Sequence, residues 1–200
     1  KRRAFHSGSL KKTVLEGLFY IVWNCLTNIF FQCYAVNIFN NNADKILMAN
    51  VAQLCNNLHA LFLSGKEHLI TTPTYHVFDM YVNMLEEYVV PTNLTTERLT
   101  HGKASTGVLD CTLTTNEDGT RYALAVVNKD PKDSRKLNID FEKMGVKMPK
   151  KISGTVLCGS SPDDFNEIGA ENRVVPEERT FEVKDGSVEL PAHSLVVLKF

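Results

Sequence analysis

The chain lacks an excess of either charge. Its 22 Lys and Arg residues nearly balance its 23 Asp and Glu residues, which leaves a formal net charge of −1 over 200 residues. We therefore expect no overall field that would draw nucleic acid or an anionic membrane surface to the molecule. Because 44% of the residues are hydrophobic and 22% are charged, the composition predicts a packed core rather than disorder.

The sequence also lacks the spaced cysteine and histidine pairs that bind metals. No two cysteines form a CxxC motif and their count is odd, so neither a disulfide framework nor a zinc site is expected. None of the six histidines belongs to an HxH or HExxH motif. We expect no metal, no cofactor, and buried reduced thiols, which favour a reducing compartment and hence the cytoplasm. The cysteines are Cys25, Cys33, Cys55, Cys111 and Cys158.

Long apolar runs are scarce, and residues 14–39 are the segment that raises the question of a membrane. They follow a basic stretch, as the apolar part of a signal anchor does. However, polar residues recur at multiples of four and form one narrow stripe on a helix, which is more typical of the interior of a large soluble protein. We therefore expect no membrane partner, and a membrane-anchored β-domain is the alternative. The stripe consists of Glu16, Asn24, Asn28 and Gln32.

The first 90 residues carry helical and continuous apolar patterns. Residues 45–54, KILMANVAQL, form a short apolar run between polar residues, which predicts a buried parallel strand. Residues 56–65 predict a short helix that ends at Gly65. A further helix is predicted from Thr72 to about residue 85, because Thr72 can cap it and Pro73 suits its first turn. Helices and a buried strand in alternation are typical of an α/β fold.

After residue 90 the pattern changes to the period of two that half-buried strands show. Strands are predicted at residues 108–115, 120–128, 136–141 and 151–159. Residues 179–200 predict three more short strands, with Asp185-Gly186 as a hairpin turn. Short strands separated by turns predict an antiparallel β-sandwich. The expected fold class is therefore mixed, with an α/β segment followed by a sandwich.

Motifs for several common chemistries are absent from the sequence. There is no GxSxG, no Walker loop and no glycine-rich dinucleotide fingerprint. Retaining glycosidases use two carboxyl groups about 5 Å apart. No acidic pair falls at the carboxyl end of a predicted parallel strand, where the active site of an α/β protein lies. We therefore assign no catalytic residue to this chain.

One polar residue does occupy such a position. Gln53 lies at the predicted carboxyl end of the strand over residues 45–54. Its amide both donates and accepts hydrogen bonds, so it can hold a pair of sugar hydroxyls. It can equally satisfy backbone groups where the strand runs into a loop. The spacing alone leaves both roles open.

Several stretches give the sequence a family resemblance. Residues 37–81 contain NIFNNNAD, MANVAQ and TPTYHVFDMY in that order, and the tail contains LAVVNKDP, LCGSSPDDFNEIGAENRVVP and VELPAHSLVVLKF. Together they resemble the C-terminal part of the α-L-arabinofuranosidases of glycoside hydrolase family fifty-one, over about residues 35–200. The resemblance is weak over residues 1–34, which are expected to contain an apolar helical segment.

The resemblance implies that residues 35–90 are the last strand and helices of a (β/α)8 catalytic barrel and that residues 91–200 are a jelly-roll-like sandwich. It implies retaining hydrolysis of terminal α-L-arabinofuranosyl groups in arabinose-containing oligo- and polysaccharides. The two catalytic glutamates would lie on earlier strands that this chain lacks, so the chain alone is expected to be inactive. The full-length parent is expected to be a homo-oligomer.

The resemblance also assigns roles to single residues. It implies that Gln53 contacts arabinose in its subsite. It implies that TPTYHVFDMY is the final barrel helix, in which Tyr75, Phe78 and Tyr81 pack rather than catalyse.

A non-catalytic carbohydrate-binding or structural sandwich is the alternative reading. Many sandwiches bind sugars on exposed aromatic rings, but residues 104–200 contain no Trp and few other aromatics, most of them at positions expected to be buried. These aromatics are Tyr122, Phe141, Phe165, Phe181 and Phe200.

Overall fold

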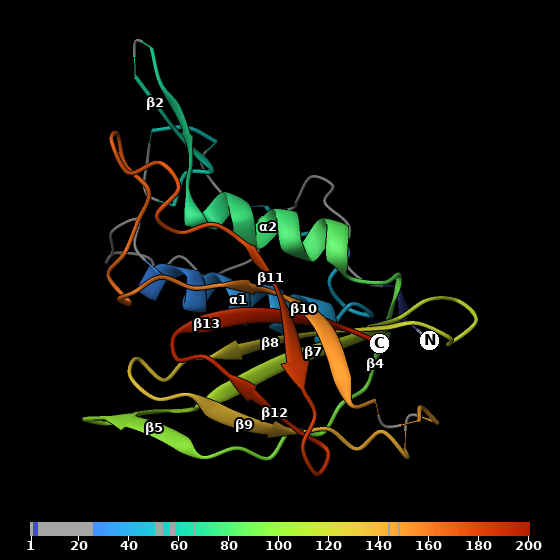
Figure 1. Ribbon diagram of the computed structural model, residues 1–200. Coiled ribbons are helices and arrows are strands. Elements are labelled where there is room, and N and C mark those ends of the chain that lie inside the picture. Colours follow the sequence, from blue (N-terminus) through green and yellow to red (C-terminus); the bar gives the residue numbers. More distant parts are fainter. Residues whose placement is uncertain are drawn as a thin grey trace.

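The computed structural model describes residues 2–3, 26–50, 54–56, 59–65, 67–143, 145–147 and 149–200 (Figure 1). In these residues the structure is mostly β-sheet with two helices. The elements, in chain order, are β1 (Arg2–Arg3), α1 (Leu26–Asn41), β2 (Phe62–Ser64), β3 (Leu69–Thr71), α2 (Pro73–Met84), β4 (Tyr88–Val90), β5 (Arg98–His101), β6 (Ala104–Gly107), β7 (Leu109–Thr115), β8 (Tyr122–Asn128), β9 (Arg135–Asn138), β10 (Lys151–Leu157), β11 (Glu177–Glu182), β12 (Ser187–Leu190) and β13 (Ser194–Lys199).

A seven-stranded sheet in the order β1-β4-β7-β8-β13-β10-β11 forms the centre of the described chain. All of its neighbouring strands are antiparallel. The predicted antiparallel strands at residues 108–115, 120–128 and 151–159 are confirmed as β7, β8 and β10. β4 ends at Val90 and yet pairs with β7, so the sheet already includes residues on the N-terminal side of residue 91.

The second layer of the sandwich is the pair β9 and β12, which covers one face of the large sheet (Figure 1). A buried apolar cluster fills the space between them and includes Leu124 and Val126 of β8, Leu137 of β9, and Val188 and Leu190 of β12. The β-sandwich that the alternating pattern predicts is thereby confirmed, although β9 is shorter than the predicted strand over residues 136–141.

The predicted turn at Asp185-Gly186 is present, but the strands it joins separate. Both turn residues have positive φ angles, 51° and 74°, and Lys184 and Ser187 exchange backbone hydrogen bonds of 3.0 and 2.9 Å. Before this turn β11 pairs with β10 in the large sheet, whereas after it β12 pairs with β9 in the small one. The turn therefore carries the chain from one layer of the sandwich to the other.

The two helices cover the opposite face of the large sheet (Figure 1). A second buried cluster joins Cys33 and Val36 of α1 and Met80 of α2 to the sheet residues Ala125 and Val197. Alternate residues of β8 and β13 thus face the helices or the small sheet. This two-sided burial is why both strands are continuous apolar runs.

The helix α2 confirms the helix predicted from residue 72. The Thr72 hydroxyl accepts a hydrogen bond from the Tyr75 amide at 3.4 Å, and Pro73 is the first helical residue. Tyr81 is 3% exposed, and Phe78 packs against the buried cluster between the two helices and the large sheet. The ring of Tyr75 lies 5.3 Å from that of Phe62. All three aromatics expected to pack do so.

Two predicted elements of the first half are wrong where the structure describes them. Residues 45–50 form a turn and irregular chain rather than a strand, and Leu47 is 96% exposed. A parallel strand needs hydrogen-bonded neighbours, and no described strand pairs with residues 45–50. The helix over residues 56–65 is replaced by β2, which pairs with β3. Asn56 and His59 have positive φ angles that a helix does not accept.

The hairpin of β5 and β6 lies where the sequence pattern showed a connecting segment.

The apolar segment over residues 14–39 is described only in part. Residues 14–25, which include Glu16 and Asn24, lie outside the described residues. The described remainder belongs to α1. Neither described helix has the length and apolarity that crossing a membrane requires.

Candidate functional site

Gln53, the residue predicted to bind substrate, lies outside the described residues. The structure describes the chain on both sides of it, up to Asn50 and again from Leu54. The segment that follows, residues 54–72, contains β2 and β3, and we call it the hairpin loop. Its described residues show how the chain next to Gln53 is held.

The beginning of the hairpin loop is fixed to β2 by the side chain of Asn56. Its amide nitrogen donates to the Ser64 carbonyl at 3.0 Å, and its side-chain oxygen accepts from the Ser64 amide at 2.7 Å. The backbone N–H of Asn56 donates to the Phe62 carbonyl at 3.0 Å. These three bonds tie Asn56 to both ends of β2.

The end of the hairpin loop is fixed to the first turn of α2. The Thr72 hydroxyl donates to the buried Ala60 carbonyl at 2.7 Å, and the Thr72 amide donates to the Leu61 carbonyl at 3.0 Å. Thr72 is 1% exposed. The residue that caps α2 therefore also ties the loop to the helix N-terminus.

Two histidines border the hairpin loop, and burial lowers the pKa of both. The Gln32 side-chain nitrogen lies 3.1 Å from Nδ1 of His59. Nε2 of His76 lies 3.4 Å from the Thr71 hydroxyl, and the nearby Asp79 charge only partly offsets the effect of burial on its pKa. Both imidazoles are therefore favoured in the neutral form, in which one ring nitrogen donates and the other accepts. Gln32 belongs to the predicted polar stripe, and in the structure it makes this partly buried contact.

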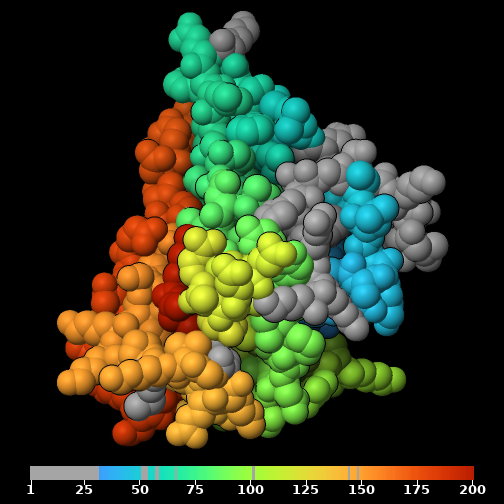
Figure 2. Space-filling model, turned by 90° about the vertical axis from the view of Figure 1, so that its right-hand side faces the viewer, coloured from blue at the N-terminus to red at the C-terminus, as the bar shows by residue number. Residues whose placement is uncertain are grey.

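A loop from the sandwich lies beside the hairpin loop. Residues 158–176 connect β10 to β11, and we call them the sandwich loop. The side-chain nitrogen of Asn166, which is 1% exposed, donates to the Thr71 carbonyl at 3.0 Å and to the Val174 carbonyl at 2.9 Å. Its oxygen accepts from the Val174 amide at 2.8 Å. Figures 1 and 2 show the two loops next to each other at one end of the molecule.

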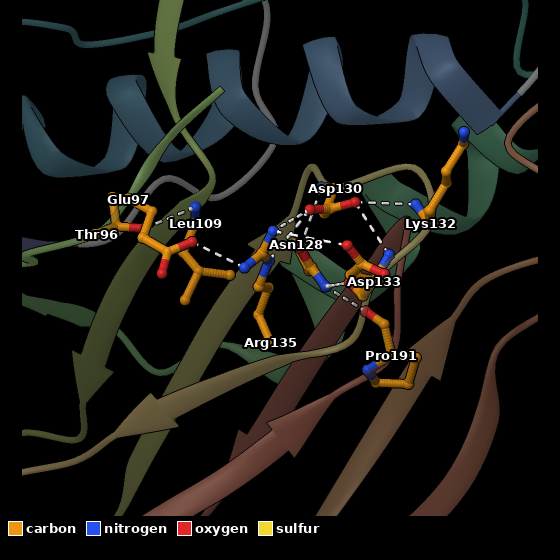
Figure 3. Close-up of polar contacts among 9 residues, drawn as sticks. All are labelled: Thr96, Glu97, Leu109, Asn128, Asp130, Lys132, Asp133, Arg135 and Pro191. Carbon is orange, nitrogen blue, oxygen red and sulfur yellow. Dashed lines mark hydrogen bonds and ion pairs between the residues drawn. The ribbon is translucent and has the colours of Figure 1, made fainter. Parts of the chain in front are cut away.

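The most extensive charged cluster lies elsewhere, at the turn between β8 and β9 (Figure 3). The Asp130 carboxylate accepts from the Lys132 and Asp133 amides at 3.0 Å each and from the Arg135 guanidinium. Arg135 also pairs with Glu97 at 2.8 Å. Burial raises the pKa of Asp130, but these hydrogen bonds outweigh it and lower the pKa below its usual value.

The partners in this cluster are all groups of the chain itself. The Asn128 side chain donates to the Asp133 and Pro191 carbonyls at 3.1 and 2.8 Å. The cluster thus joins the turn after β8 to the segment before β13. It explains the NKDP motif as a structural turn rather than as a binding site.

Thiols and imidazoles do not gather into a metal site in the part of the chain that the structure describes. Cys33 and Cys111 are buried, as expected, and burial raises the pKa of Cys111 to about 11. Cys55 is exposed, so the expectation of buried thiols is wrong at that position. Cys25 lies outside the described residues.

Comparison with known proteins decides the family. The family model described as the alpha-L-arabinofuranosidase C-terminal domain matches residues 24–194, which is most of the chain. The chain belongs to this family. The resemblance that the sequence motifs indicate is thereby confirmed, and the match includes both helices and most of the sandwich.

Individual arabinofuranosidases agree with the family match. An intracellular exo-alpha-L-arabinofuranosidase of Bacteroides ovatus is 28% identical over 180 residues, which are 88% of this chain and 34% of that protein. The solved arabinofuranosidase of Xanthomonas axonopodis pv. citri has a TM-score of 0.74 and 26% identity, over 88% of this chain and 36% of its own. That of Thermotoga maritima, solved with arabinose, gives 0.74 and 26%, over 88% and 38%. The chain thus spans about a third of the length of these relatives.

Three described carboxylates of this arabinofuranosidase C-terminal domain make structural contacts. Asp79 accepts a hydrogen bond from Asn83 at 2.7 Å, and Glu86 forms an ion pair with Arg121 at 3.1 Å. Asp110 accepts from the Asn37 side chain at 3.1 Å in the layer between α1 and β7. Burial raises the pKa of Asp110, although the bond from Asn37 opposes this. These contacts give the three carboxylates structural roles.

Proposed function

We propose that this chain is the C-terminal part of a retaining α-L-arabinofuranosidase that hydrolyses terminal α-L-arabinofuranosyl groups of oligo- and polysaccharides. The observation that carries the proposal is the unequal coverage of the family matches. They include 88% of this chain but only 34% to 38% of each arabinofuranosidase. A domain of this family that lies within longer enzymes is best explained as one part of such an enzyme.

The arrangement of the helices supports the proposal that residues 35–90 belong to a (β/α)8 barrel. Figure 1 shows α1 and α2 side by side and running in the same direction. The segment predicted to be a parallel strand lies between them in the sequence. Consecutive outer helices of a barrel are related in this way, because each follows a strand of the same direction. Leu47 and Leu54, which are 96% and 65% exposed, belong to that segment. Its described residues 45–50 are irregular in this chain, and in the proposed barrel neighbouring strands would cover both side chains.

We propose that Gln53 binds the arabinosyl group of the substrate. In a barrel the active site lies at the carboxyl ends of the strands, on the loops that lead into the helices. The hairpin loop that follows Gln53 leads directly into the N-terminus of α2. An amide at this position can hold two neighbouring hydroxyls of the sugar.

The nucleophile and the general acid/base of this proposed enzyme lie on earlier barrel strands outside the chain. The chain alone is therefore inactive. We further propose that the parent enzyme is a homo-oligomer located in the cytoplasm. The cytoplasmic location is supported by the Bacteroides ovatus relative, which is named as intracellular.

The native size of the polypeptide tests this proposal. An antibody against the sandwich should detect, in extracts of the source organism, a protein about three times as long as this chain, since relatives have about that length. Mass spectrometry of that band should find peptides of this sequence together with upstream peptides containing the two glutamates. A native protein of about 200 residues would contradict the proposal.

A further inference from the structure

Phe165 is the exposed aromatic side chain of the sandwich. Phe141 and Phe181 are only 3% and 9% exposed. Tyr122 and Phe200 stack on each other, with ring centroids 6.0 Å apart, and pack against the apolar cluster between the two sheets. Phe165 is 36% exposed. Among the five aromatics of residues 104–200, it is the ring most available to a ligand.

The surroundings of Phe165 hold it in a defined place. Its neighbour Asn166 is buried and bonded to the Thr71 and Val174 carbonyls. Before it, the Asp164 carboxylate accepts from the Ser160 amide at 2.7 Å and from the Ser161 amide at 3.0 Å. The sandwich loop is therefore braced on both sides of the ring.

A cationic side chain further orients the ring. The guanidinium carbon of Arg173 lies 6.0 Å from the centre of the Phe165 ring, within the distance over which a cation is attracted to an aromatic face. Arg173 is in turn paired with Glu167 at 3.3 Å. Two more apolar side chains of the adjoining loops are exposed, Ile168 at 63% and Leu69 of β3 at 69%. The sandwich loop and β3 of the hairpin loop, which Asn166 joins, thus carry three exposed apolar side chains.

The position of the sandwich loop relates it to the proposed substrate site. Asn166 contacts Thr71, which immediately precedes the N-terminal cap of α2. In a barrel the N-terminus of the helix lies at the same end as the carboxyl end of the preceding strand, which is the catalytic end. The sandwich loop therefore lies at the end of the molecule where Gln53 and the active site are proposed to lie.

We infer that Phe165 is a specificity-determining residue that stacks on the saccharide to which the arabinosyl group is attached. The inference rests on the proposed function. The sugar held by Gln53 is the terminal arabinosyl group, and the rest of an oligosaccharide must extend out of the barrel across its rim. An aromatic ring on a loop beside that rim offers the apolar face of a pyranose or furanose ring a flat partner.

Kinetics with two substrates on the full-length parent enzyme test the inference. One substrate is 4-nitrophenyl α-L-arabinofuranoside, and the other is an arabinose-substituted oligosaccharide of at least four sugars. Phe165→Ala should lower kcat/KM for the oligosaccharide about three- to tenfold more than for the chromogenic substrate, mainly by raising KM. Phe165→Tyr, which keeps the ring, should restore most of the difference.

Tyr34→Ala is the matched control. Tyr34 has nearly the same exposure, 37%, and also lies beneath a cation, Lys129 Nζ at 4.7 Å, but Lys129 bonds to Thr106 of β6 and not to the sandwich loop. It should leave the ratio of the two kcat/KM values unchanged. If Phe165→Ala leaves this ratio unchanged in an active enzyme, the inference is overturned and the proposed function stands. A wild-type parent that cleaves neither substrate would overturn both.

Discussion

The hydroxyl of Tyr81 donates a 2.7 Å hydrogen bond to the side-chain oxygen of Asn37, and this bond joins α2 to α1. The nitrogen of the same Asn37 side chain donates to Asp110 of β7 at 3.1 Å. Asn37 is fully buried and Tyr81 is 3% exposed. Burial raises the pKa of Tyr81 well above its usual value, so the hydroxyl remains a donor. A chain of polar contacts thus runs from one helix through the other to the sheet.

Tyr81→Phe should destabilise the chain by about 1–3 kcal/mol, because it leaves the buried Asn37 oxygen without its donor. Urea unfolding followed by circular dichroism measures the free energy of unfolding. Asn83→Ala is the control, since it removes an exposed hydrogen bond to Asp79 within α2. It should lower the free energy of unfolding by less than about 0.5 kcal/mol. Equal effects of the two substitutions would show that the Tyr81–Asn37 contact is not a stabilising link.

Removal of the helices should expose one face of the large sheet. A truncated chain that begins at Glu86 keeps β4 but loses α1 and α2, which cover Ala123, Ala125 and Val197. It should bind a hydrophobic dye such as ANS and unfold at a lower urea concentration than the full chain, since its apolar face is then in water. An unchanged unfolding midpoint without dye binding would mean that the sandwich needs no cover on that face.

The packing of the two helices on the large sheet shows which parts of the fold could be predicted from the sequence and which could not. The alternating pattern predicted most of the antiparallel strands, and the cap at Thr72 predicted α2, because both signals are local. The continuous apolar run of β8 is compatible with two-sided burial, but which segments cover it was not predictable, because the covering residues Val36 and Met80 lie far away in the sequence. For the same reason β2 was mistaken for part of a helix: its pairing with β3 depends on a partner strand that the local pattern does not reveal.

The candidate site was predictable only in outline. Gln53 followed from its place at the end of an apolar run and from the family resemblance, and its role stays a prediction. No local pattern indicated that Asn166, 95 positions away along the chain, would contact Thr71. Phe165 was noted as one of a few aromatics, but which of them is exposed depends on the path of the sandwich loop.

The Asp130 cluster predicts a specific acid sensitivity. The pKa of Asp130 is lower in the folded chain than its usual value. The ionised carboxylate therefore stabilises the fold above the unfolded-state pKa of about 3.9, and this stabilisation is lost as the pH falls through the folded-state pKa. Asp130→Asn should cost about 1–3 kcal/mol at pH 7. The difference from wild type should shrink below about pH 4.

Unfolding in urea at several pH values between 3 and 7 measures this effect. Asp133→Asn is the matched control, since that carboxylate is 74% exposed and 4.0 Å from Arg135, and exposed pairs contribute little. A pH profile of Asp130→Asn parallel to that of wild type would show that Asp130 does not contribute through its charge.

Gln53→Ala in the full-length enzyme should lower kcat/KM about ten- to a thousandfold. Each buried hydrogen-bonding group left without its partner costs about 1–3 kcal/mol, and an amide that holds two hydroxyls loses two such bonds. Kinetics and melting temperature should be measured on the same preparation. If Gln53 only satisfies backbone groups, the melting temperature falls and kcat/KM of the folded enzyme stays nearly unchanged, contrary to the proposed substrate contact.

The division of function between this chain and the rest of the enzyme is the central claim, and a direct comparison of activities tests it. The full-length parent and the isolated chain should be purified in parallel and assayed on 4-nitrophenyl α-L-arabinofuranoside. The account predicts hydrolysis by the parent and none by the chain, because both catalytic carboxylates are proposed to lie outside it. Turnover by the isolated chain that survives controls for contaminating enzymes, or a folded parent without activity, would contradict the account.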